Sequence, residues 1–179
     1  MKNKLLHRGT AAVLLAALAL SGCASAPPEQ PVATLPGVEG DAFLANLAGH
    51  WDITRKIRGT IVRNRLDSHW VLQHRFLELH MVDVARPPKY EAIVLIGYDR
   101  RRDRYVAHWT DTYGAGYSGV GYGRRVGDSV DFAFRSDDGT FHNTFTWNPA
   151  ERTWRSRMES EGKDGARAFF AEDLLRRAD

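Results

Sequence analysis

The side chains in this sequence that could do chemistry are one carboxylate, Asp111, and several scattered histidines. Asp111 follows Trp109 by two positions in an alternating segment, so we expect it to share the face that points into the core. A buried carboxylate needs a hydrogen-bonding or charged partner. Arg55 is the predicted partner, because it alternates in phase with Trp51 and Ile53. Three interpretations stay open here: an internal salt bridge, a surface carboxylate at the end of the strand, or a polar anchor for a ligand.

Histidine side chains can bind metals or haem iron and can move protons near neutral pH. His69 alternates with charged residues, which predicts exposure, whereas the face of His74 and His80 is ambiguous. His142 alternates with three threonines, so it should lie outside the barrel or line a polar cavity. No pair has helix or zinc-finger spacing. The sequence therefore predicts no metal site, leaves the cofactor unknown, and keeps haem as an alternative without an assigned ligand.

A glycine-rich stretch superficially matches two catalytic motifs. Gly114 to Gly119 fits G-x-G-x-x-G, but no helix of a βαβ unit follows it, so a nucleotide site is not expected. Gly116 to Val120 misses the nucleophile elbow G-x-S-x-G by its last residue. We interpret the stretch as a tightly bent strand with close backbone approach. With no complete catalytic set, the sequence names no catalytic residue and favours binding over catalysis.

The elements that must position these residues are short strands around a central hairpin, Tyr90 to Tyr113. Its first strand is apolar on both faces, which is typical of a barrel wall or a sandwiched strand. Further strands alternate at regular spacing; they are predicted at 49–57, 60–72, 75–84, 129–135, 140–147, 153–162 and 166–176, after a short helix at 41–47. The last segment could also form a short helix. The predicted fold is all-β, an up-and-down antiparallel β-barrel of about ten strands with a short N-terminal helix, or else a sandwich.

The N-terminal segment predicts that the protein is targeted to the cell envelope. Residues 1–22 have a basic start and a ten-residue apolar run, Ala11 to Leu20, which is too short to span a bilayer and fits a secretion signal. Leu20 to Cys23 resembles the bacterial lipoprotein box, so Cys23 is the predicted lipidation site. Residues 23–40 contain four of the seven prolines and predict a tether, which leaves 41–179 as the barrel domain. By resemblance to such lipoproteins, Ser25 favours the periplasmic face of the outer membrane.

Charge argues against a nucleic-acid partner once the signal is removed. Three of the 25 basic residues lie in residues 1–22, which contain no acid, so 22 basic and 22 acidic residues remain. The expected partners are a small apolar molecule and a membrane reached only through the lipid anchor.

Several short motifs carry a family resemblance. The segments Ser68 to Leu77, Leu95 to Asp99 and Arg104 to Asp111 resemble the bacterial family known as domain of unknown function 1579, over roughly residues 47–176. Gly49-His50-Trp51 is similar to the G-x-W opening of calycin barrels, the lipocalin and fatty-acid-binding group. Gln73 and His74 stand where members of the family often have glycines. The resemblance implies a ligand-sized cavity but no settled activity.

We therefore expect an envelope lipoprotein that binds a small apolar molecule inside its barrel. The candidate ligand-binding residues combine aromatic walls with polar contacts: Trp70, His74, Tyr98, Trp109, Asp111, Tyr117 and Trp154. One alternative is an interaction module whose interior is fully packed by these aromatics. A second is a haem-binding protein or an isomerase- or hydrolase-like enzyme.

Overall fold

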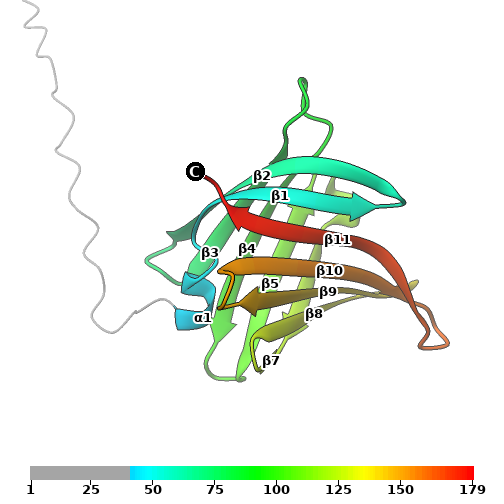
Figure 1. The fold of residues 1–179 in the computed structure, drawn as a ribbon. Coiled ribbons are helices and arrows are strands. Elements are labelled where there is room, and N and C mark those ends of the chain that lie inside the picture. The colour runs from blue at the N-terminus through cyan, green and yellow to red at the C-terminus, as the bar shows by residue number, and fades with distance from the viewer. Residues whose placement is uncertain (1–40) are drawn as a thin grey trace, which may run out of the picture. The chain divides into compact units, whose positions relative to one another are not determined.

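The structure is a computed structural model that describes residues 41–179 (Figure 1). The predicted signal, the tether and Cys23 lie outside these residues. The helical elements are α1 (Ala42–Ala45) and the 3-10 turn η1 (Ala115–Tyr117). The strands are β1 (Gly49–Ile57), β2 (Thr60–Val71), β3 (Phe76–Asp83), β4 (Glu91–Asp99), β5 (Arg104–Asp111), β6 (Gly119–Gly123), β7 (Arg125–Val126), β8 (Ser129–Ser136), β9 (Gly139–Asn148), β10 (Thr153–Glu161) and β11 (Arg167–Arg177). Within residues 41–179, neither helical element has the length and apolar character needed to cross a membrane as a helix.

Ten of these strands close into an antiparallel barrel. Neighbours along the chain pair from β1 to β6 and from β8 to β11, and the β1–β11 and β6–β8 pairings complete the ring. The two-residue β7 pairs with β8 alone. Closure removes the exposed sheet edges that would otherwise invite aggregation. The predicted all-β barrel of about ten strands is confirmed, and residues 167–177 form a strand rather than a helix.

The two ends of the barrel differ. At the helix end, α1 lies across the opening, beside the start of β1 and the end of β11 (Figure 1). Asp41 caps α1 by accepting hydrogen bonds from the amides of Phe43 and Leu44, as its sequence position predicts. The Tyr105 hydroxyl donates to the same carboxylate. We call the opposite end, where β1 ends and β2 begins, the far end.

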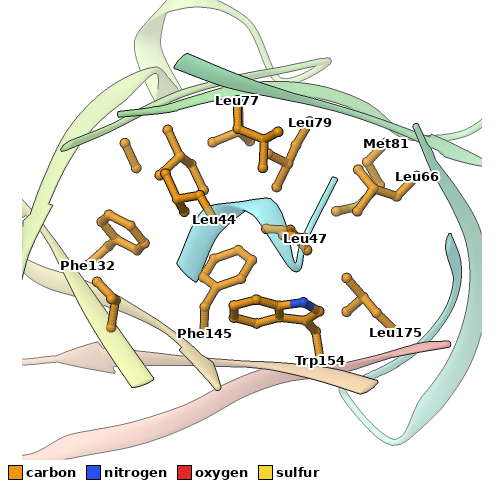
Figure 2. Close-up of a cluster of buried hydrophobic side chains, with 14 of the residues drawn as sticks. Leu44, Leu47, Leu66, Leu77, Leu79, Met81, Phe132, Phe145, Trp154 and Leu175 are labelled. Carbon is orange, nitrogen blue, oxygen red and sulfur yellow. The ribbon is translucent and has the colours of Figure 1, made fainter. Parts of the chain in front are cut away.

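Apolar side chains pack the half of the barrel next to α1. Trp51 and Trp154 are almost fully buried, and their indole nitrogens donate to the backbone oxygens of Leu47 and Asn46. Leu44 and Leu47 of α1 project among side chains from the surrounding strands (Figure 2). Burying such a side chain stabilises a fold by roughly 1.5–3 kcal/mol. The helix therefore closes this end of the barrel and is part of its packed core.

Close approach of neighbouring groups explains the glycines of β6. A Cβ on Gly121 would lie 2.7 Å from the Phe134 ring, and one on Gly123 would meet the carbonyl oxygen of Asp131. Gly114, which precedes η1, has a φ of 89°. The predicted close approach is confirmed at Gly121 and Gly123, whereas residues 114–118 form a turn and η1 rather than a bent strand.

Candidate functional site

A buried ion pair lies inside the barrel, towards the far end. Both Arg55 Nε and Nη2 donate to the Asp173 carboxylate at 2.7 Å, and the two residues are 8% and 1% exposed. Burial on its own lowers the pKa of Arg55, but the hydrogen bonds and charge of Asp173 outweigh it and raise the pKa. The predicted pairing of Arg55 with Asp111 is wrong, because β11 brings Asp173 beside Arg55 in the β1–β11 ladder.

Tyr90 links this ion pair to Asp111. The Arg55 guanidinium lies over the Tyr90 ring, 5.2 Å from its centroid, and the Tyr90 hydroxyl donates to Asp111 Oδ2 at 3.3 Å. Burial raises the pKa of Tyr90 to about 12, with Asp111 adding to the rise and Arg55 opposing it. The far half of the barrel therefore contains one continuous polar network from β11 to β5.

Asp111 sits at the edge of that network without a counter-ion. Its carboxylate accepts from Trp109 Nε1 at 3.1 Å and from the amide of Tyr113 at 2.9 Å, besides the Tyr90 hydroxyl. Among residues 41–179 it pairs with no Lys, Arg or His side chain. It also borders a hollow of about 240 Å³ on the outer face of the wall, which Glu91, Ile93 and Thr110 line. An anion held by neutral donors is able to receive a cationic or hydrogen-bond-donating group.

Two further polar side chains face the interior from β2. Asn64 is 1% exposed and Ser68 is 2% exposed, and neither the Asn64 amide nor the Ser68 hydroxyl has a hydrogen-bond partner in residues 41–179. Asn64 pairs in register with Asp83 and alternates with buried Leu66. Buried polar groups almost always have a partner, so each of these marks a place where an ordered water or a ligand atom would be stabilised.

The seven predicted site residues fall into two groups. Trp70, Tyr98 and Trp154 lie at the helix end, where β2 and β4 finish and β10 begins, and His74 is in the adjoining turn. Trp109, Asp111 and Tyr117 lie at or beside the far end. They therefore cannot line one small pocket.

The helix-end group is built into the packed region or its rim. Trp154 is 0% exposed and packs edge-on against Phe43, 5.0 Å between ring centroids. The Trp70 ring lies 6.1 Å from that of exposed His74, and the Tyr98 hydroxyl donates to Asp103. These contacts explain the positions of the four residues by packing and hydrogen bonding at the end of the barrel that α1 closes.

The far-end group has an aromatic rim. Tyr90, Tyr113 and Tyr117 form a series with 6.0 Å between successive ring centroids. Tyr117 is 74% exposed, so it lies outside the barrel wall in η1. Trp109 contacts Phe134 edge-on inside the wall, at 6.4 Å. Asp111 therefore has aromatic rings around it, and two of them, Tyr113 and Tyr117, are exposed to solvent.

The described histidines are on turns or on the outer surface. His69 and His108 are exposed, and His80 binds Glu91 at 2.6 Å on the outer face. His142 is on the outer wall as well, yet it is only 6% exposed, because Asp131 and Glu161 contact its two ring nitrogens at 2.9 and 3.1 Å. Within residues 41–179, no group of three or more His, Cys, Asp or Glu side chains is arranged to hold a metal ion. The residues present thus offer no interior histidine to a haem.

Sequence reasoning missed Asp173 and Tyr90 as parts of the polar network around Arg55, and it missed Asn64 as a buried polar side chain without a partner among the described residues. Asp173 lies in phase with Ala171 and Leu175, a period-two signal that the adjacent Phe169-Phe170 and Leu174-Leu175 pairs obscured. Asn64 likewise alternates with Leu66 in phase with the buried face. For Asp173 and Asn64 the available signal was the same: a polar residue that alternates in phase with the buried residues of its own strand.

Comparison with solved structures supports the fold. The chain is similar to the crystal structure of Rv2717c from M. tuberculosis, with a TM-score of 0.55 and 10% sequence identity over 79% of this chain and 100% of that one. At this identity the likeness concerns the barrel alone. No protein-family model matches the chain, so the resemblance to the domain of unknown function 1579 remains a prediction. No curated protein matches it either.

Proposed function

We propose that this barrel binds a small, largely apolar molecule at its far end, with the polar group of the ligand held by Asp111. The observation that carries the proposal is the half-buried Asp111 carboxylate, fixed by three neutral donors and free of a counter-ion among the described residues. Trp109, Tyr90 and Tyr113 supply apolar surface around it. A carboxylate set among aromatic rings suits an ammonium or another hydrogen-bond donor.

The charge of the interior argues against a ligand carboxylate. Arg55 is the cation that such a ligand would need, but Asp173 already occupies it through two hydrogen bonds. Releasing Arg55 would leave Asp173 buried and unpaired, which is costly. The unpartnered amide of Asn64 offers the interior a neutral donor and acceptor instead.

The experiment compares two amphiphiles of equal chain length, below their micelle concentrations, as competitors of a hydrophobic dye bound to the full chain. Dodecyltrimethylammonium should displace the dye about tenfold more strongly than dodecanoate, a difference of roughly 1.4 kcal/mol. Asp111→Asn should abolish that preference. Asp128→Asn is the matched control, because it removes an equal charge from an exposed turn at the helix end.

Absence of dye uptake and of displacement by either amphiphile would refute ligand binding and favour the packed interaction module. If the protein prefers dodecanoate and Asp111→Asn leaves that preference unchanged, the role of Asp111 is refuted, but ligand binding is not.

We also propose that the barrel is anchored in the bacterial envelope through lipidated Cys23. The support is the sequence: a signal-like segment in residues 1–22, then a small-residue box ending at the single cysteine. Mass spectrometry of the mature protein should find Cys23 as an acylated N-terminus, and Cys23→Ser should move the protein out of the membrane fraction. An unmodified Cys23 in membrane-bound protein would contradict the proposal.

A further inference from the structure

A second hollow lies at the helix end, away from the Asp111 site. It measures about 690 Å³ and is bounded by the turn between β9 and β10 and by the last residues of β11. The residues that line it are Glu151, Arg152, Thr153, Arg176 and Arg177. Three of the five are arginines, and only one is acidic. This composition indicates an excess of positive charge around a recess that is large enough for a substituted anion.

Among residues 41–179, the guanidinium groups of Arg152, Arg176 and Arg177 have no partner of opposite charge. Trp154 pairs with Leu175 in the β10–β11 ladder, which brings Arg152 and Arg177 to the same end of these two strands. Burial lowers the pKa of Arg177, and the positive charge of Arg152 lowers it further. Asp52 is the register partner of Arg176 on β1, yet none of the three arginines forms an ion pair within residues 41–179. The positive charges of Arg152 and Arg177 therefore repel one another unless an anion lies between them.

Arg177 is held in a fixed position beside the hollow. Its Nη1 and Nη2 donate to the backbone oxygens of Ala48 and Asn46 at 2.6 and 3.2 Å, and its guanidinium lies 4.0 Å from the Trp51 ring centroid. A Cβ at Gly49 would collide with Nη1, so that glycine makes room for the arginine. These contacts prevent Arg177 from turning away from Arg152 to relieve the repulsion. The positive charge is therefore built into the fold rather than carried by freely moving side chains.

We propose that Arg152, Arg176 and Arg177 form a binding site for a phosphate-bearing anion. Guanidinium groups bind phosphate oxygens through paired hydrogen bonds, and several around one recess provide this from more than one side. The anion could be free phosphate or the phosphate of a lipid headgroup.

The test is calorimetric titration of the full chain in detergent with inorganic phosphate and with a short-chain, water-soluble phosphatidic acid. We expect saturable binding of at least one, weakened about tenfold or more by Arg152→Ala or Arg176→Ala. Arg135→Ala is the matched control, since it removes an equal charge from an exposed position at the far end and should leave binding unchanged. Binding of both ligands indicates a site for phosphate itself, and binding of the phosphatidic acid alone indicates a headgroup site.

A charge-reversal variant separates the proposal from a loss of fold. Arg152→Glu gives Arg177 an opposite charge, so it should abolish binding while keeping or raising the melting temperature. The proposal is overturned if neither ligand binds. It is also overturned if both alanine variants and Arg152→Glu bind the ligand with the same affinity as Arg135→Ala.

Discussion

Removing Asp173 should destabilise the barrel more than any exposed charge does. Asp173→Ala would leave the Arg55 guanidinium, 8% exposed, without its two 2.7 Å hydrogen bonds and without a counter-charge. Breaking one side of a buried ion pair in this way costs about 3–5 kcal/mol. For a domain of this size the loss lowers the melting temperature by roughly 10–15 °C. The neighbouring Glu172, whose contacts with Arg155 and Arg157 are 4.0 Å long, is the matched comparison.

The assay is urea unfolding of Asp173→Ala, of Glu172→Ala and of the double variant Arg55→Met/Asp173→Leu. Glu172→Ala should lose less than about 1 kcal/mol, as exposed pairs do. The double variant should recover most of the loss, because an apolar pair leaves no buried charge behind. A loss below about 1 kcal/mol in Asp173→Ala, or a double variant no more stable than the single, would refute the claim that Arg55 depends on Asp173.

Three further predictions concern β6, the far-end network and α1. Gly123→Ala should cost about 1–3 kcal/mol, since its Cβ would meet the Asp131 backbone, whereas Gly116→Ala, with open space around it, should be close to neutral in the same urea assay. Stability should fall between pH 10 and about 12, because the raised pKa of Tyr90 keeps its hydroxyl neutral in the folded state while the unfolded chain ionises from pH 10, and Tyr90→Phe should flatten this fall in unfolding curves measured at each pH. Asp41→Ala should lose about 1–2 kcal/mol and Asp41→Asn less, measured by thermal unfolding, since the asparagine oxygen can still cap α1.

The strands and turns could be predicted from the sequence because they depend on residues that are close together in the chain. Alternation in β1, β2 and β3 reflects the pleat of each strand, and the gaps predicted between strands at 58–59 and 148–152 agree with the observed gaps to within one residue. The N-cap at Asp41 was predictable for the same reason, because its partners Phe43 and Leu44 are two and three residues away. Strand number and spacing predicted an antiparallel barrel or a sandwich, and the β1–β11 and β6–β8 pairings decide in favour of the closed barrel.

Contacts between distant strands could not be predicted in this way. Arg55 and Asp173 are 118 residues apart, and only the β1–β11 ladder places them together. The same holds for the separation of the candidate residues: strand phase shows that Trp154 and Trp109 face inward, but not that they lie at opposite ends.

The amino-acid sequence alone determined the all-β class, the phase of each strand and the start of the helix, because these depend on neighbouring residues and on the period of the backbone. Only the tertiary structure decided that Asp111 lacks a counter-ion among the described residues while Arg55 does not, and that Arg152 lies near Arg177. Pairing of charges depends on the register between strands far apart in the chain, and many registers are compatible with the same alternating pattern.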